Sequence, residues 1–273
     1  MLLVHGFGAS IAHWRFNIPA LVEAGHTVWA VDLLGFGGSD KPETYTYTME
    51  GWRDLLLDFV EEFIDEPAVI VGNSIGSLAS LMTAAANPSA FAGVVLCNTA
   101  GAMNNKAISD DWRLQLARPI FLLIDWLLLQ PAIAERLFNG FRTPENIAQT
   151  LKNVYSNEGN VDADLVELIY RPSCDAGALD AFVKIITGPP GPRPEDLLPQ
   201  IDAPLLLLWG DEDPFTPMDG PVAKYFIDLA RTRPDTQFSV IPGCGHCPHD
   251  DRPELVHREL LPWLARYQTL DAA

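Results

Sequence analysis

Residues 72–76 read Gly-Asn-Ser-Ile-Gly, directly after the apolar residues 69–71 and directly before the small and apolar residues 77–81. This pattern predicts a strand, a sharp turn and a helix, with Ser74 at the apex of the turn. The flanking glycines let the backbone pass closely, and the turn pushes the Ser74 hydroxyl out of the sheet over a helix N-terminus. The stretch therefore predicts a nucleophilic serine.

Strands and helices alternate around this turn, apart from one long interruption. Alternation of this kind is typical of βαβ units, which form a mostly parallel sheet with helices on both faces. Between Ala100 and Gly188 we find helical segments and no convincing strand. We therefore expect an α/β core, residues 1–100 and 188–273, with a helical lid inserted at residues 101–187. The predicted strands are residues 1–4, 27–31, 69–71, 94–97, 204–209 and 237–241, and the predicted helices are residues 49–63, 75–86, 221–229 and 253–267.

Composition limits the classes of partner. The chain has 273 residues and a formal net charge of −18, from 36 acidic and 18 basic residues. Nucleic acid is an unsuitable partner because phosphate binding needs a basic face, and an anionic membrane would repel this charge. The 4 cysteines do not make a disulfide scaffold. No targeting peptide is visible, and the sequence leaves the oligomeric state open.

A serine hydroxyl becomes a strong nucleophile only when a base takes its proton and a third group orients that base. In a parallel sheet the partners of Ser74 should lie on loops after later strands. The acidic residues 211–213 follow one predicted strand, and residues 242–246, Pro-Gly-Cys-Gly-His, follow the next. We prefer His246 to His249 as the base, because it follows Gly245 immediately after the strand.

The tetrahedral intermediate of acyl transfer also needs hydrogen-bond donors for its oxyanion. One predicted donor is the backbone N–H of Ile75, the residue after the nucleophile. The second is the N–H of Phe7, in the loop His5-Gly6-Phe7-Gly8 after the first strand. We expect His5 to hold this loop by hydrogen bonds rather than to act in catalysis. Residues 32–40 are expected to shape the rim of the site.

Together these motifs resemble the α/β-hydrolase superfamily over the whole chain, in which serine, acid and histidine follow one another in this order. The resemblance selects Asp213 as the acid, because Trp-Gly-x-x-Asp-Pro matches the acid turn of that fold. It also implies that the first strands of the fold are missing upstream of Met1. Within the superfamily the chain resembles plant and algal chlorophyll dephytylases and pheophytinases. This closer likeness rests on Asn73-Ser74 and on residues 98–106, 188–192 and 245–254.

The resemblance implies that the substrate is a phytyl ester of a chlorophyll-type pigment and that the protein acts in the chloroplast. Ser74 would attack the ester carbonyl, with His246 as base and Asp213 orienting it. No metal or organic cofactor is expected, since any magnesium would belong to the pigment.

Residues 119–129 form an unusually apolar segment of the predicted lid, with one charge, Asp125, in eleven residues. A helix on the outside of a core should have a polar face, so this segment must contact apolar groups on both sides. It is shorter than the ~20 residues of a membrane span. Tight packing within the lid, a pocket lining and peripheral contact with the thylakoid membrane all remain open. We predict Gly6, Asn73, Leu123, Trp126 and Leu127 as substrate-binding residues.

Residues 244–247, Cys-Gly-His-Cys, match the redox motif of disulfide isomerases. That chemistry needs the first cysteine at a helix N-terminus in a thioredoxin-like context, whereas here the motif follows a late strand. A zinc site is disfavoured because no second C-x-x-C exists. A regulatory disulfide between Cys244 and Cys247 that displaces His246 remains a hypothesis.

Two alternatives to an esterase stay open. Carbon–carbon bond hydrolases of this fold often also have Gly-Asn-Ser, and plant butenolide-type receptors keep the triad and the lid but signal by closing on their ligand. Epoxide and halide chemistry is disfavoured, because those relatives place aspartate where Ser74 stands. Multiple turnover of a chlorophyll would exclude the receptor.

Overall fold

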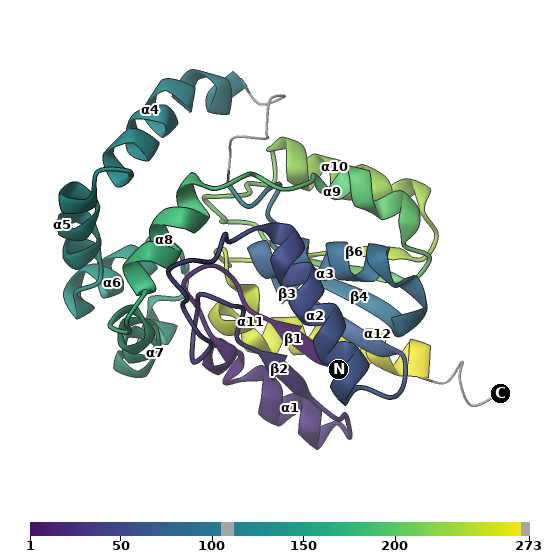
Figure 1. Ribbon diagram of the computed structural model, residues 1–273. Helices are drawn as coiled ribbons and strands as arrows, with labels where there is room; N and C mark the ends of the chain where they lie inside the picture. Colours follow the sequence, from purple (N-terminus) through teal and green to yellow (C-terminus); the bar gives the residue numbers. More distant parts are fainter. Residues whose placement is uncertain (105–111, 269–273) are drawn as a thin grey trace.

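The computed structural model describes residues 1–104 and 112–268. Asn105 and Lys106, which belong to one of the motifs above, lie outside the described residues. The chain forms a parallel sheet of order β2-β1-β3-β4-β5-β6, flanked by helices (Figure 1). The mostly parallel α/β sheet expected from the sequence is confirmed. The strands are β1 (Leu2–Val4), β2 (Trp29–Val31), β3 (Ala68–Asn73), β4 (Phe91–Cys97), β5 (Leu205–Gly210) and β6 (Thr236–Ile241).

Helices cover both faces of the sheet, and each face has its own apolar cluster. One cluster lies between the sheet and α2, α3 and α10, and it includes Trp52, Leu78 and Phe226. The other lies under α1 and α12 and includes Leu21 and Trp263. The core helices are α1 (Asn17–Glu23), α2 (Met49–Phe63), α3 (Ile75–Ala86), α9 (Pro194–Leu197), α10 (Pro221–Thr232), α11 (Pro248–Asp251) and α12 (Pro253–Gln268).

The sequence of α2 explains its position. The side chain of Thr48 accepts a hydrogen bond from the Gly51 N–H and so caps the first turn. Trp52, Leu56 and Val60 recur at helical spacing and are buried against the sheet. The amphipathic pattern therefore fixes both the start of the helix and the face that it buries.

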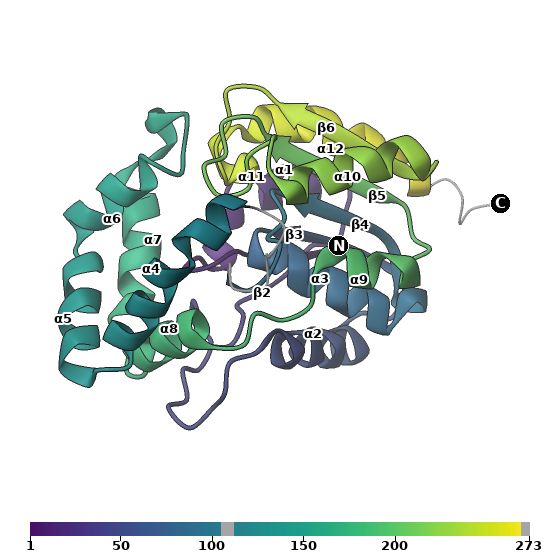
Figure 2. The same cartoon turned by 90° about the horizontal axis from the view of Figure 1, so that it is seen from above.

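In its described residues the segment between β4 and β5 has helices and no strand, and most of it lies to one side of the sheet (Figures 1 and 2). It contains α4 (Trp112–Leu128), α5 (Pro131–Phe141), α6 (Pro144–Leu151), α7 (Ala163–Ser173) and α8 (Ala178–Thr187). We call α4–α8 the lid. Short 3-10 helices complete the fold: η1 (Ile11–Trp14), η2 (Pro88–Ala90), η4 (Glu158–Asn160) and η5 (Leu198–Gln200).

Within the described residues, no single helix is both long and apolar enough to cross a bilayer.

Candidate active site

Ser74 occupies a strained backbone conformation between β3 and α3. Its φ of 55° and ψ of −120° lie in a region that residues with a side chain rarely adopt, at a cost of about 1–3 kcal/mol. The strain is held in place by close packing of the turn. A Cβ on Gly72 would lie 2.5 Å from the carbonyl oxygen of Gly76, and one on Gly76 would overlap the carbonyl oxygen of His5. Both positions therefore require glycine, as the sequence motif predicts.

The structure brings Ser74, His246 and Asp213 together. His246 Nε2 lies 2.8 Å from Ser74 Oγ, and His246 Nδ1 lies 2.8 Å from Asp213 Oδ2. Asp213 is 3% exposed and Ser74 and His246 are each 9% exposed, so little water competes for these hydrogen bonds. With Nδ1–H donating to the carboxylate, Nε2 is free to accept the Ser74 proton.

Several donors converge on the Asp213 carboxylate. Oδ2 also accepts from Thr216 Oγ1 and from Asn98 Nδ2, each at 2.5 Å, and Oδ1 accepts from the Phe215 N–H at 2.7 Å. Burial alone raises the pKa of Asp213. The charge of His246 and the hydrogen bonds from His246, Thr216 and Phe215 outweigh burial and lower that pKa to about 2. The carboxylate is therefore ionised at neutral pH.

The other two acidic residues of this turn do not reach His246 in any hydrogen bond between described residues. Asp211 and Glu212 are exposed, and the Asp211 carboxylate accepts from the backbone N–H of Cys244.

Asn98, which donates to the Asp213 carboxylate, was not identified from the sequence. A φ of 42° marks it in the structure, but nothing in the sequence around the end of β4 distinguishes it.

The nucleophile is flanked by the start of α3 and by the loop that carries Phe7. Ile75 is the first residue of α3, directly after Ser74, and among the described residues its N–H makes no hydrogen bond outside the helix. The loop that carries Phe7 passes closely, because a Cβ on Gly6 would lie 3.3 Å from Ser74 Cβ. The Phe7 ring is 43% exposed and packs edge-on against Phe36. The Gly6–Phe7 loop and the first residue of α3 thus both adjoin Ser74, and the assignment of the Phe7 and Ile75 N–H groups as oxyanion donors stays a prediction.

His5 holds the loop, as expected. Its Nδ1 lies 2.7 Å from the Gly6 carbonyl oxygen, and its Nε2 accepts from the Leu33 N–H at 3.0 Å. Burial lowers the pKa of His5 and favours this neutral form. Asp32 holds the neighbouring rim by accepting from the N–H groups of Ile11 and Gly38.

Asn73 does not occupy the position predicted for a substrate contact. Its side chain is 1% exposed, and Nδ2 donates to the carbonyl oxygens of Cys97 and His246 at 3.2 and 3.0 Å. A buried amide must satisfy its polar atoms locally, and these backbone carbonyls provide the acceptors. Asn73 therefore ties the His246 loop to β4. Gly6, by contrast, lies against Ser74.

The three predicted lid residues lie on α4. Leu123 and Trp126 are 54% and 58% exposed, and Leu127 is partly buried. Large apolar side chains are exposed over much of this helix and directly after it, and we call them the apolar lid face: Leu116, Ile120, Leu122, Leu123, Ile124, Trp126 and Leu129. Tight packing within the lid therefore does not account for the apolar sequence of α4.

Cys244 and Cys247 are free thiols buried on either side of His246. Burial raises the pKa of both, and nearby carboxylates raise it further. Protonated thiols are poor nucleophiles in disulfide exchange, so the environment disfavours redox chemistry at this motif. Across residues 1–104 and 112–268, no group of three or more His, Cys, Asp or Glu side chains is arranged to hold a metal ion.

The sequence of residues 1–259 matches the alpha/beta hydrolase family. An uncharacterized hydrolase of Bacillus subtilis, YugF, is 26% identical over 97% of this chain and 89% of its own length. The chloroplastic pheophytinase of Arabidopsis thaliana is 28% identical over 98% of this chain, which spans only 62% of that protein. Other matched relatives are named as a semialdehyde hydrolase and as epoxide hydrolases.

A solved serine hydrolase involved in carbazole degradation superposes with a TM-score of 0.72 at 24% identity, covering 97% of this chain and 89% of that one. This likeness supports the fold. With the matched family extending over the core and the lid, the chain belongs to the alpha/beta hydrolase family.

Proposed function

We propose that this hydrolase is a serine esterase that cleaves carboxylic esters through an acyl-enzyme. The observation that carries the proposal is the continuous hydrogen-bond chain from Ser74 through His246 to Asp213. His246 takes the Ser74 proton as Oγ attacks the ester carbonyl, and the imidazolium then protonates the leaving alcohol. His246 then deprotonates a water molecule that attacks the acyl carbonyl, and the imidazolium returns this proton to Ser74 Oγ as the carboxylic acid leaves.

The N–H groups of Phe7 and Ile75 stabilise the oxyanion of both tetrahedral intermediates. Donors fixed on the backbone do not need to reorganise during the reaction, so they stabilise the developing charge efficiently. The N-terminus of α3 adds a favourable electrostatic field at the same point.

We further propose that the ester is lipophilic and that the substrate class is the phytyl ester of a chlorophyll-type pigment. Pheophytinase is one of the more similar relatives, and the apolar lid face offers contact area for a long isoprenoid alcohol or for the membrane that holds it. The net charge of −18 favours an uncharged lipid surface over an anionic one. A peripheral position on the thylakoid membrane of the chloroplast fits this chemistry.

The esterase proposal is tested by incubating the enzyme with chlorophyll and with pheophytin and measuring free phytol by chromatography. A soluble short-chain nitrophenyl ester serves as a second substrate. Release of phytol over many turnovers, lost in Ser74→Ala, supports the full proposal. If only the short ester is hydrolysed, the result supports esterase activity and contradicts the proposed pigment substrate.

Lipid contact has its own test. Sedimentation with vesicles of uncharged galactolipid should carry down the wild-type protein but not the double variant Leu123→Glu/Trp126→Glu. Val240, on β6 of the core, is 47% exposed, so Val240→Glu is a control that adds charge elsewhere. Equal sedimentation of the double variant and the wild type would contradict membrane contact through α4.

Carbon–carbon bond hydrolysis is the second candidate, because the Gly-Asn-Ser turn is shared with such enzymes and a semialdehyde hydrolase is among the relatives. A dienoate ring-cleavage product cleaved faster than any ester would favour it. A receptor of the same fold would instead show a single turnover with a persistent adduct.

A further inference from the structure

A segment of the lid lies directly against the loop that carries His246. We call residues 152–162, between α6 and α7, the lid connection. The backbone N–H of His246 donates to the carbonyl oxygen of Val154 at 2.9 Å. A Cβ on Gly245 would overlap that same carbonyl oxygen and lie 3.2 Å from the Ser156 nitrogen. The lid connection therefore contacts the backbone of the base itself.

The side chain of Asp251 stabilises this contact by hydrogen bonds to both segments. Its buried carboxylate accepts from the Gly245 N–H at 2.5 Å and from the Ser156 N–H at 3.0 Å through Oδ2. Oδ1 accepts from the Asn157 N–H at 2.8 Å. One carboxylate thus holds the residue before His246 and two consecutive residues of the lid connection. Charge-assisted hydrogen bonds of this kind are stronger than neutral ones.

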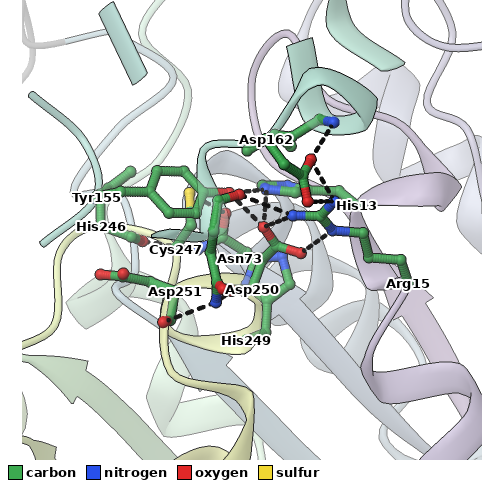
Figure 3. A network of polar contacts seen from close by, with 12 residues as sticks. His13, Arg15, Asn73, Tyr155, Asp162, His246, Cys247, His249, Asp250 and Asp251 are labelled. Carbon is green, nitrogen blue, oxygen red and sulfur yellow. Dashed lines mark hydrogen bonds and ion pairs between the residues drawn. The ribbon is translucent and has the colours of Figure 1, made fainter. Parts of the chain in front are cut away.

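The preceding residue, Asp250, makes a second tie to the lid connection (Figure 3). Its Oδ2 accepts from the Tyr155 hydroxyl at 2.9 Å, and its Oδ1 accepts from Arg15 Nε at 2.8 Å. Arg15 also pairs with Asp162 at 2.8 Å, where the lid connection ends. The side chain of Cys247, one residue after His246, packs in a small apolar cluster with Tyr155 and the lid helices.

We propose that Asp251 is a positioning residue, which holds the His246 imidazole against Ser74 by locking its loop to the lid connection. The proposal rests on His246 being the base of the proposed esterase. Among the described residues, Asp251 makes no hydrogen bond to the imidazole or to Ser74, so it acts through the backbone of residues 245 and 246. Without the carboxylate, the buried Gly245 N–H and the partly buried N–H groups of Ser156 and Asn157 lose their acceptor, and the loop can shift. Misplacing a catalytic group by about 1 Å can cost about a hundredfold in rate.

The first variant is Asp251→Asn, which preserves size but presents an amide N–H to backbone donors. With a soluble nitrophenyl ester, we expect kcat to fall about tenfold to hundredfold. KM should not change, because Asp251 is fully buried and out of reach of a bound substrate. Asp175→Asn is the matched control: it removes another ion pair between lid and core, from Lys41 Nζ to Asp175 Oδ2 at 2.8 Å, that does not involve the His246 loop. This control should keep the wild-type kcat.

The proton NMR signal of His246 Nδ1–H, in its hydrogen bond with Asp213, reports the position of the imidazole independently of activity. We expect this signal to shift or broaden in Asp251→Asn and to stay unchanged in Asp175→Asn. If the wild-type protein hydrolyses no ester, the esterase proposal fails, while the NMR comparison still tests the role of Asp251.

Three results would overturn the inference: a folded Asp251→Asn with lower thermal stability but wild-type kcat, an equal loss of kcat in Asp175→Asn, or an unchanged His246 signal. If Asp251→Asn does not fold, Tyr155→Phe replaces it. That variant removes the Tyr155 hydroxyl, and with it the hydrogen bonds to Asp250 and His13, and it should also lower kcat, by a smaller factor. A wild-type kcat there would count against the inference equally.

Discussion

Asn98 donates a hydrogen bond from its side-chain Nδ2 to Asp213 Oδ2 across 2.5 Å. The oxygen of the same amide accepts from the Gly210 N–H at 2.9 Å, so Asn98 joins the ends of β4 and β5. Asparagine is one of the few residues with a side chain that tolerates the φ of 42° found here. The amide therefore fixes the acid of the triad relative to the sheet.

Replacing Asn98 with alanine should leave Asp213 without one of its donors. Losing a hydrogen bond to a buried charged group costs about 1–3 kcal/mol. If the same hydrogen bond stabilises the transition state, its loss lowers the rate by about tenfold to hundredfold. Steady-state hydrolysis of a nitrophenyl ester measures it. A kcat within twofold of wild type would mean that Thr216 and Phe215 suffice to orient Asp213.

Asp213→Asn should have a larger effect than Asn98→Ala. The amide keeps the shape of the carboxylate but cannot stabilise an imidazolium, and it allows the tautomer that presents N–H to Ser74. The expected loss in kcat is about 10³-fold or more, by analogy with serine proteases. Glu212→Gln, on an exposed residue of the same turn, is the control and should retain activity. Activity that depends on Glu212 instead would reassign the acid.

His249 gives the fold a specific sensitivity to acid. The ring is fully buried against Trp14 and His13, and neither of its nitrogens has a hydrogen-bond partner among the described residues. Burial lowers the pKa of His249 well below 6.5, and it lowers the pKa of His13 to about 4. Below pH 6.5 the unfolded chain therefore binds protons that the folded protein does not, so the free energy of unfolding should decrease as pH falls toward 4.

The variant His249→Leu removes one of these groups without removing a hydrogen bond. Its denaturant midpoint should fall less steeply than that of wild type between pH 6.5 and pH 4. At pH 8 both histidines are neutral, so there the variant should be about as stable as wild type. If the denaturant midpoints of the two proteins fall in parallel between pH 6.5 and pH 4, His249 does not contribute to the acid sensitivity of the fold.

Gly76→Ala tests the close packing that holds the strained turn. The added methyl group would meet the backbone carbonyls of Val4 and His5, which cannot move aside as a side chain could. Overpacking of this kind costs about 1–3 kcal/mol of the free energy of unfolding. Gly140→Ala, in α5, is the control, because a Cβ there meets nothing within 4 Å and should stabilise the helix slightly. If Gly76→Ala and Gly140→Ala have the same free energy of unfolding, close packing at Gly76 does not hold the strained turn.

Local patterns predicted the parts of the fold that depend on neighbours in sequence. The start of α2 follows from its Thr48 cap and its buried face from the apolar spacing, and the Ser74 turn at the start of α3 follows from its glycines. The strands of the sheet were also located, with ends that differ by a few residues. The short helices α1 and α11 were missed, because each is too brief to show a periodic pattern.

Contacts between distant segments could not be predicted in the same way. Asn98 meets Asp213 across 115 positions, and Asp251 meets Ser156 across 95. No local spacing distinguishes these side chains from other polar residues at strand or helix ends. Asn73 was misassigned for a related reason: its place beside Ser74 suggests substrate contact, but its side chain turns into the protein toward Cys97 and His246.

The central claim, that Ser74 is an activated nucleophile, is tested most directly by trapping the acyl-enzyme. The protein is mixed with an activated ester, quenched in acid during the first turnover, and analysed by mass spectrometry after digestion. We expect the acyl mass on the peptide that contains Ser74, and Ser74→Ala should lose the adduct together with about 10³-fold or more of the rate. An acyl group on another side chain, or undiminished hydrolysis by Ser74→Ala, would contradict the account.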